Sequence, residues 1–236
     1  MNNDSGVFLL PFLMPLVFVV LAGGLIWFAW QQNKKRRAAA QAFAAARGWT
    51  YTPDVPGLLE RWRSAPFGIG GSRRASNVLT GDFHGRHVVS FDYQYTTGSG
   101  KSRSTSYFHV VALSLPAALP WLRLSPDGAG AAMARFFGGQ DVDVESEAFN
   151  RAWRVQASPP PQYAYDFVHP RMIERLMAPD AVGRMITVEG ADMVLVSNGH
   201  QVLEAIDMYA NLLYGIDDLI PRHLWLKVGH DPLANR

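Results

Sequence analysis

The 236-residue sequence contains no cysteine. Without thiols the chain can form no disulfide, and it offers neither a thiolate nucleophile nor a cysteine ligand for a metal. This absence is typical of proteins from reducing compartments and fits a cytoplasmic domain. The sequence also lacks a nucleophile elbow, a zinc-protease helix and a dinucleotide fingerprint. No catalytic residue, cofactor or metal is therefore predicted.

Charge is absent from a long stretch near the N-terminus, Val7 to Trp30. A helix rises about 1.5 Å per residue and a bilayer core is about 30 Å thick, so this stretch is long enough to span a membrane. A cleavable signal peptide is disfavoured, because the leader carries Asp4 and no Lys or Arg. The pattern predicts a transmembrane anchor within residues 1–33, with Trp27 and Trp30 at the inner interface.

Four consecutive cations follow this stretch: Lys34, Lys35, Arg36 and Arg37. Cations gather on the cytoplasmic side of membrane helices, and the N-terminal flank has none. The expected localisation is the cell membrane, in a single-pass arrangement with the N-terminus outside and the C-terminal domain cytoplasmic. The expected partner of the anchor is the lipid bilayer.

The remaining charge is unevenly distributed. Residues 38–236 carry 18 cations and 19 anions, yet residues 61–103 net to +5 and residues 104–236 to −5. A basic region near a membrane anchor can contact anionic lipid headgroups, although the two halves can equally complement each other or carry solvated charges. Nucleic acid is disfavoured because no dense basic stripe or known module is present. The candidate anion-binding residues are Arg73, Arg74, Lys101 and Arg103.

The predicted domains follow the composition. Residues 34–47 are rich in helix-forming Ala, Lys, Arg and Gln, and they are expected to form a basic juxtamembrane helix that ends at Gly48. Residues 48–236 are expected to form a cytoplasmic α+β domain. Three consecutive prolines mark a candidate internal boundary near residues 158–162, although they can also form a tight loop.

The expected fold class is α+β, with antiparallel hairpins and helices in irregular order after the anchor. Alternating apolar residues predict a hairpin from strands 78–83 and 87–96, joined by a turn at 84–86. The remaining predicted strands cover residues 107–115, 121–124 and 153–157, and a second hairpin joins 185–188 to 193–196. The predicted helices cover residues 129–137, 146–151, 171–177 and 200–219, and residues 66–76 and 97–104 are expected to be loops.

Histidines and a carboxylate gather around the first predicted hairpin: His84, His87, His109 and Asp92. These side chains can bind metals or transfer protons, but their spacing matches no complete ligand set. The string from Gly98 to Ser102 is not a phosphate loop, because the motif requires a glycine where Tyr95 stands.

Three segments carry a resemblance to a known group of proteins: FHVVALSLP (108–116), FNRAWRV (149–155) and IPRHLW (220–225). With the anchor and its cations, they resemble uncharacterised bacterial single-pass membrane proteins with a cytoplasmic α+β domain. The resemblance implies no reaction and no catalytic residue.

Two functional hypotheses remain. The first is a non-enzymatic, membrane-anchored module that binds protein partners or the anionic membrane surface. The alternative is a membrane-tethered enzyme, such as a hydrolase, that uses the region of His84, His87, His109 and Asp92.

Overall fold

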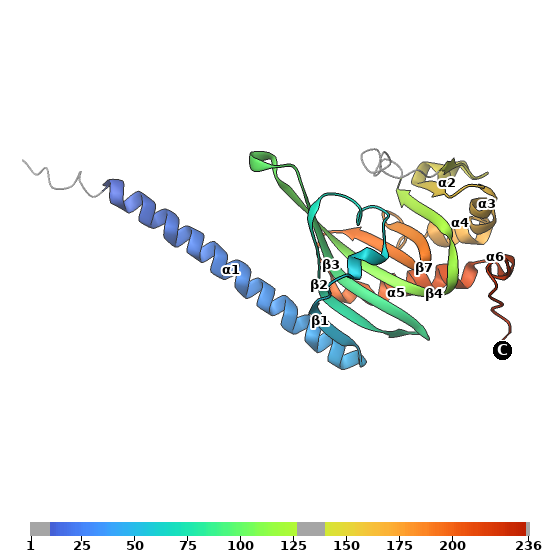
Figure 1. Ribbon diagram of the computed structural model, residues 1–236, viewed down its shortest axis with the longest axis horizontal. Coiled ribbons are helices and arrows are strands. Elements are labelled where there is room, and N and C mark those ends of the chain that lie inside the picture. Colours follow the sequence, from blue (N-terminus) through green and yellow to red (C-terminus); the bar gives the residue numbers. More distant parts are fainter. Residues whose placement is uncertain (1–9, 127–139, 235–236) are drawn as a thin grey trace, which may run out of the picture.

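A long N-terminal helix precedes a seven-stranded antiparallel sheet with shorter helices packed against it (Figure 1). This computed structural model describes residues 10–126 and 140–234, and the side chains of the first helix from residue 19 onward. The first helix, α1, is Leu10–Arg47 and runs without interruption through the predicted division between residues 33 and 34. The predicted helix over residues 129–137 lies outside the described residues.

The sheet is organised around one long strand, β4. The strands are β1 (Thr50–Asp54), β2 (Gly71–Phe83), β3 (Arg86–Thr97), β4 (Ser104–Pro126), β5 (Gln140–Val142), β6 (Trp153–Ala157) and β7 (Met185–Asn198). Their order is β1-β2-β3-β4-β6-β5, and β7 also pairs with β4. The first half of β4 pairs with β3 and β7, and its end pairs with β6 and β7. β4 therefore joins the two halves of the chain.

Short helices cover the second half of the sheet. They are α2 (Glu147–Ala152), α3 (Gln162–Phe167), α4 (Pro170–Leu176) and α6 (Arg222–Lys227), together with the longer α5 (Leu203–Leu219). Two 3₁₀ helices, η1 (Leu58–Arg61) and η2 (Gly100–Ser102), lie in the first half of the chain. Helix α5 buries one apolar face, including Ile206, Leu213 and Ile216. The longest predicted helix of the domain is thus confirmed, although it starts at Leu203.

Both faces of the central strands are buried. Val111 and Leu113 of β4 join a large core with α3 to α6, whereas Val110 and Ala112 join a smaller aromatic core on the other face. This alternation is expected, because successive strand residues point to opposite sides of a sheet. The smaller core contains Trp62, Phe67, Phe91, Tyr93 and Tyr95.

The structure confirms the α+β class and the first hairpin, which is formed by β2 and β3. The second predicted hairpin is wrong, because residues 185–198 form one continuous strand along β4. Gly190 has a positive φ of 62° at a shift in the strand register, so the apparent turn is an irregularity within a strand. Asp192 accepts hydrogen bonds from Arg61 and from the Trp62 indole, which attaches η1 to this strand.

Two further differences concern the extent of strands. β2 begins at Gly71, inside the stretch predicted as a loop, and β4 continues through the gap between its two predicted strands. Pro116 and Pro120 interrupt the pattern expected of a strand, and the β4–β7 register shifts in this part. Residues 158–161 connect β6 to α3, and the internal boundary proposed there stays a prediction.

The C-terminal end of α1 packs against the domain. Ala40 and Ala44 are 1% and 3% exposed, and they form a small core with Leu79 of β2 and Ile206 of α5. Small alanine side chains let the helix backbone approach the sheet closely. An ion pair between Arg47 and Asp207, with an N to O distance of 2.5 Å, lies beside this contact.

The apolar part of α1 does not meet the prediction of a transmembrane helix. Within the part of the chain that the structure describes, no helix combines the length and the apolar character needed to cross a membrane. This finding overturns the predicted transmembrane helix and single-pass topology. The first residues of the predicted span lie outside the described part.

The contact between Trp49 and β2 gives a test of how α1 is attached. A Cβ atom added to Gly81 would lie 2.3 Å from the Trp49 ring, whereas one added to Gly71 of the same strand would meet nothing within 4 Å. We expect Gly81→Ala to lower the free energy of unfolding by about 1–3 kcal/mol, because the ring must move and it packs on Phe43 of α1. Urea unfolding of both variants measures this difference.

Gly71→Ala is the matched control and should remain close to the parent protein. Equal stability of the two variants would contradict the close approach of Trp49 to β2.

Candidate functional site

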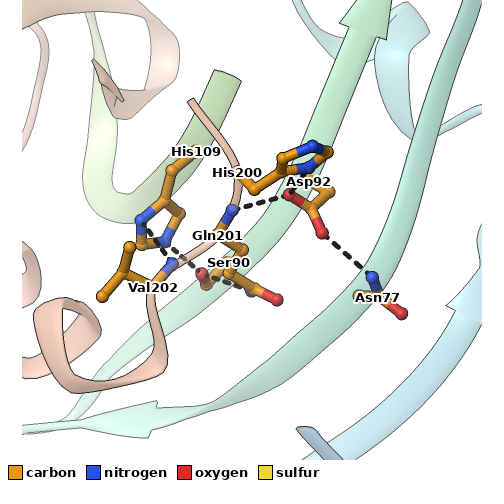
Figure 2. Close-up of polar contacts among 7 residues, drawn as sticks. All are labelled: Asn77, Ser90, Asp92, His109, His200, Gln201 and Val202. Carbon is orange, nitrogen blue, oxygen red and sulfur yellow. Dashed lines mark hydrogen bonds and ion pairs between the residues drawn. The ribbon is translucent and has the colours of Figure 1, made fainter. Parts of the chain in front are cut away.

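A buried carboxylate, Asp92 of β3, lies where the chain enters helix α5 (Figure 2). Its Oδ1 accepts a hydrogen bond of 2.6 Å from the backbone N–H of Gln201, and its Oδ2 accepts one of 2.9 Å from the Asn77 amide. His200 Nδ1 lies 3.4 Å from Oδ1. The carboxylate therefore holds the segment before α5 against β2 and β3.

Asn77 reaches Asp92 because of a local irregularity in β2. Its φ is 53°, in the left-handed region that asparagine tolerates better than most residues, and it lies within a shift of the β2–β3 register. The Asn77 carbonyl oxygen accepts a hydrogen bond of 3.1 Å from the Tyr51 hydroxyl. The irregularity thus connects β1, β2 and β3 through polar side chains.

Ser90 and His109 form a second polar group beside Asp92. The Ser90 hydroxyl lies 3.0 Å from His109 Nε2 and accepts a hydrogen bond of 2.9 Å from the Gln201 side chain. The backbone N–H of Val202 donates to His109 Nδ1 at 3.4 Å. Because Nδ1 accepts, the proton of the neutral ring lies on Nε2, which donates to Ser90.

The environment of His109 favours the neutral ring. The residue is 1% exposed, and this burial lowers the pKa of His109 to about 4. The negative charge of Asp92 raises the pKa, whereas the positive charge of Arg184 lowers it further. Arg184 lies over the Tyr209 ring, which in turn packs 5.2 Å from the His109 ring. His109 thus packs on Tyr209, and the charge of Arg184 on the same tyrosine ring disfavours the imidazolium form.

This arrangement does not form a catalytic triad. A general base must accept the proton of the serine, but here His109 Nε2 donates to Ser90. The partner of Nδ1 is a backbone N–H and not a carboxylate. Both side chains are also fully buried, which closes them to a substrate. The contacts instead secure the segment from His200 to Val202, which leads into α5.

The other predicted histidines lie elsewhere. His84 occupies the exposed β2–β3 turn near Tyr214, and His87 is exposed at the start of β3. The hydrolase alternative required these residues to meet His109 and Asp92, and they do not. Among the described residues, no group of three or more histidines and carboxylates can hold a metal ion.

A polar cleft of about 390 Å³ lies between α1 and the sheet, next to Asp92. Arg36 and Arg37 contribute from α1, and Arg74 contributes from β2. Arg74 also donates to Asp54 at 2.9 Å, in an exposed pair. The cleft therefore combines predicted membrane-interface residues with one predicted anion-binding residue.

The other three candidate anion-binding residues do not line this cleft. Arg73 donates to the backbone oxygen of Phe67 at 2.7 Å and so secures the chain before β2. Lys101 and Arg103 are exposed on the connection between β3 and β4, which projects from the sheet (Figure 1). Trp27, Trp30, Lys34 and Lys35 lie on α1 and are exposed.

Comparison with known proteins gives a likeness of fold. No protein-family model and no curated protein matches this sequence. A solved structure does match, that of the mycobacterial trehalose monomycolate transport factor A, TtfA. The TM-score is 0.57, with 17% identity over 78% of this chain and 93% of TtfA. At this identity the likeness to TtfA concerns the fold alone, and the resemblance to bacterial single-pass membrane proteins stays a prediction.

Sequence reasoning missed Asn77, Ser90 and Gln201. None of them belongs to a sequence motif. Gln201 meets Ser90 and Asp92 across more than 100 residues, and Asn77 lies at an irregularity in the strand register, so neither contact could be predicted from local sequence. A weak signal was present in Ser90, Asp92 and His109, which are polar residues inside apolar strands and need buried partners. It indicated a structural network as much as a catalytic site.

The buried His109 predicts a specific pH dependence. The unfolded chain binds a proton at an ordinary pKa of 6.5 and the folded protein only near 4, so the unfolded state carries more protons between these values. Stability should therefore fall by about 3 kcal/mol as the pH decreases through this window. Urea unfolding across the window should show that His109→Gln removes this part of the slope.

The exposed His87 provides the matched variant, and His87→Gln should keep the slope of the parent protein. A His109→Gln protein with an unchanged slope would show that His109 titrates normally in the fold.

Proposed function

We propose that the protein is a non-enzymatic module that binds an anionic membrane surface through the exposed part of α1 and presents the α+β domain to a protein partner. The proposal calls for contact with lipid and not for a membrane crossing. The observation that carries it is the exposed apolar surface of α1, which is adjacent in sequence to the chain's densest group of cations.

The apolar residues of α1 from Leu25 to Trp30 are largely exposed. Leu25 and Ile26 are 72% and 71% exposed, and Trp27 and Trp30 are 62% and 59% exposed. Neighbouring helix residues point in directions about 100° apart, so apolar side chains surround the helix. In Figure 1 this part of α1 projects away from the sheet. An apolar surface of this kind favours an apolar environment such as lipid.

The cations lie immediately after the apolar residues. Lys34, Lys35, Arg36 and Arg37 are all exposed, and the Lys34 ammonium lies 5.4 Å from the Trp30 ring centre. Tryptophan and basic residues are enriched where protein meets lipid headgroups. Each cation near an anionic leaflet contributes about 1 kcal/mol to binding. The order of apolar residues, tryptophan and cations thus matches the transition from lipid to water.

The likeness to TtfA adds modest support. That protein is described as a transport factor for trehalose monomycolate, which is consistent with a membrane-associated role for this fold. A protein partner is included in the proposal because, in the described part of the domain, the residues of the hydrolase alternative do not come together.

Vesicle binding tests the proposal. Full-length protein should bind vesicles of phosphatidylcholine mixed with phosphatidylglycerol more tightly than pure phosphatidylcholine vesicles, and added salt should weaken the difference. Replacing Lys34 and Lys35 by glutamine should weaken binding to the anionic vesicles about thirtyfold. Co-sedimentation at increasing lipid concentration measures these affinities.

The control replaces Arg151 and Arg171 by glutamine, because these exposed cations belong to α2 and α4, far from α1 (Figure 1). This variant should bind like the parent protein. Equal binding to both kinds of vesicle, or an equal loss in both variants, would refute specific docking through α1.

A further inference from the structure

We propose that the cleft between α1 and the sheet binds a doubly negative phosphate group, such as a phosphate monoester at a lipid headgroup or free phosphate. The inference rests on the proposed function where a membrane lipid supplies the phosphate group, but binding of phosphate in the cleft can be tested without lipid. The cleft is lined by Arg36, Arg37 and Arg74, together with Asp92, Tyr107 and His200.

The charge of the cleft calls for an anion. Three arginines and one aspartate line the cleft, which gives the lining a formal charge of +2 with histidine neutral. Arg74 also forms an exposed pair with Asp54, and such an exposed pair is weak in water. Asp92 is already engaged by Asn77 and by the backbone of Gln201. Arg36 and Arg37 have no ion-pair partner among the described residues. A group with two negative charges would compensate this lining.

The donors are suited to phosphate. Guanidinium groups bind phosphate oxygens with two parallel hydrogen bonds, and here they come from two elements on opposite sides of the cleft. The lining also includes the side-chain amides of Gln32 and Gln94 and the residue Tyr107, all of which can donate to further oxygens. The volume of about 390 Å³ lies at the lower end for small-molecule sites, which suits a headgroup better than a whole lipid.

The position of the cleft along α1 also fits a headgroup. Ala29 lies in the cleft wall next to the exposed Trp30, and Arg36 lies about 10 Å further along the helix axis. With the apolar residues in contact with lipid, the cleft would lie at the depth of the phosphates. The cations of α1 and the cleft would then both contact the headgroup layer of the membrane.

The first arm of the test uses lipid. Full-length protein is titrated with vesicles of matched total charge that contain either phosphatidic acid, a phosphate monoester, or phosphatidylglycerol, a diester. The parent protein should prefer phosphatidic acid, and Arg74→Gln should reduce this preference about tenfold. Arg74→Lys keeps the charge but not the paired donors, so it should lose part of the preference. Arg171→Gln removes an exposed cation of α4 outside the cleft and should preserve the preference.

The second arm uses inorganic phosphate alone. Isothermal titration calorimetry measures its binding to the full-length chain. Binding that Arg74→Gln weakens and Arg171→Gln does not would support the cleft even if no vesicle binds, and it would identify free phosphate as the ligand. A preference for phosphatidic acid without binding of free phosphate would support the cleft and assign it to a headgroup. If Arg74→Gln changes neither the preference nor phosphate binding, the inference is wrong while docking through α1 stands on its own test.

Discussion

The carboxylate of Asp92 is the contact on which the junction of β2, β3 and α5 depends. It binds the backbone N–H of Gln201 and the amide of Asn77, and so fixes the start of α5 against β2 and β3. Helix α5 then presents Ile206 and Asp207 to the end of α1. Because burying a carboxylate without hydrogen-bond partners costs free energy, the fold requires both contacts of Asp92.

The same region contains residues whose types suggest catalysis but whose contacts are structural. Ser90 and His109 look like catalytic residues by type, but their hydrogen bonds stabilise the entry to α5. The packing of Ala40 and Ala44 on Leu79 and Ile206 holds α1 beside the sheet, where Arg36, Arg37 and Arg74 line one cleft. Asp92 and Asn77 belong both to the polar network and to the lining of the basic cleft, so the two adjoin each other.

The sequence predicted local structure better than it predicted contacts. The first hairpin and α5 followed from alternating and helical apolar patterns, which depend on near neighbours. The turn predicted at 189–192 was wrong because pairing with β4 and the contact of Asp192 with η1 favoured a strand there. Asn77 and Gln201 were missed because only the fold brings them to Asp92. The membrane crossing was inferred from hydropathy, and the described part of α1 does not provide it.

The most direct test of the account places a single reporter on α1. Because the chain has no cysteine, Ile26→Cys can be labelled with one nitroxide, and Met177→Cys gives an exposed control on the domain. With the protein bound to anionic vesicles, electron paramagnetic resonance should show that the label at position 26 collides with oxygen dissolved in lipid and not with a water-soluble nickel complex. The label at position 177 should show the reverse. A label at position 26 that remains accessible to the nickel complex would contradict docking of α1 in lipid.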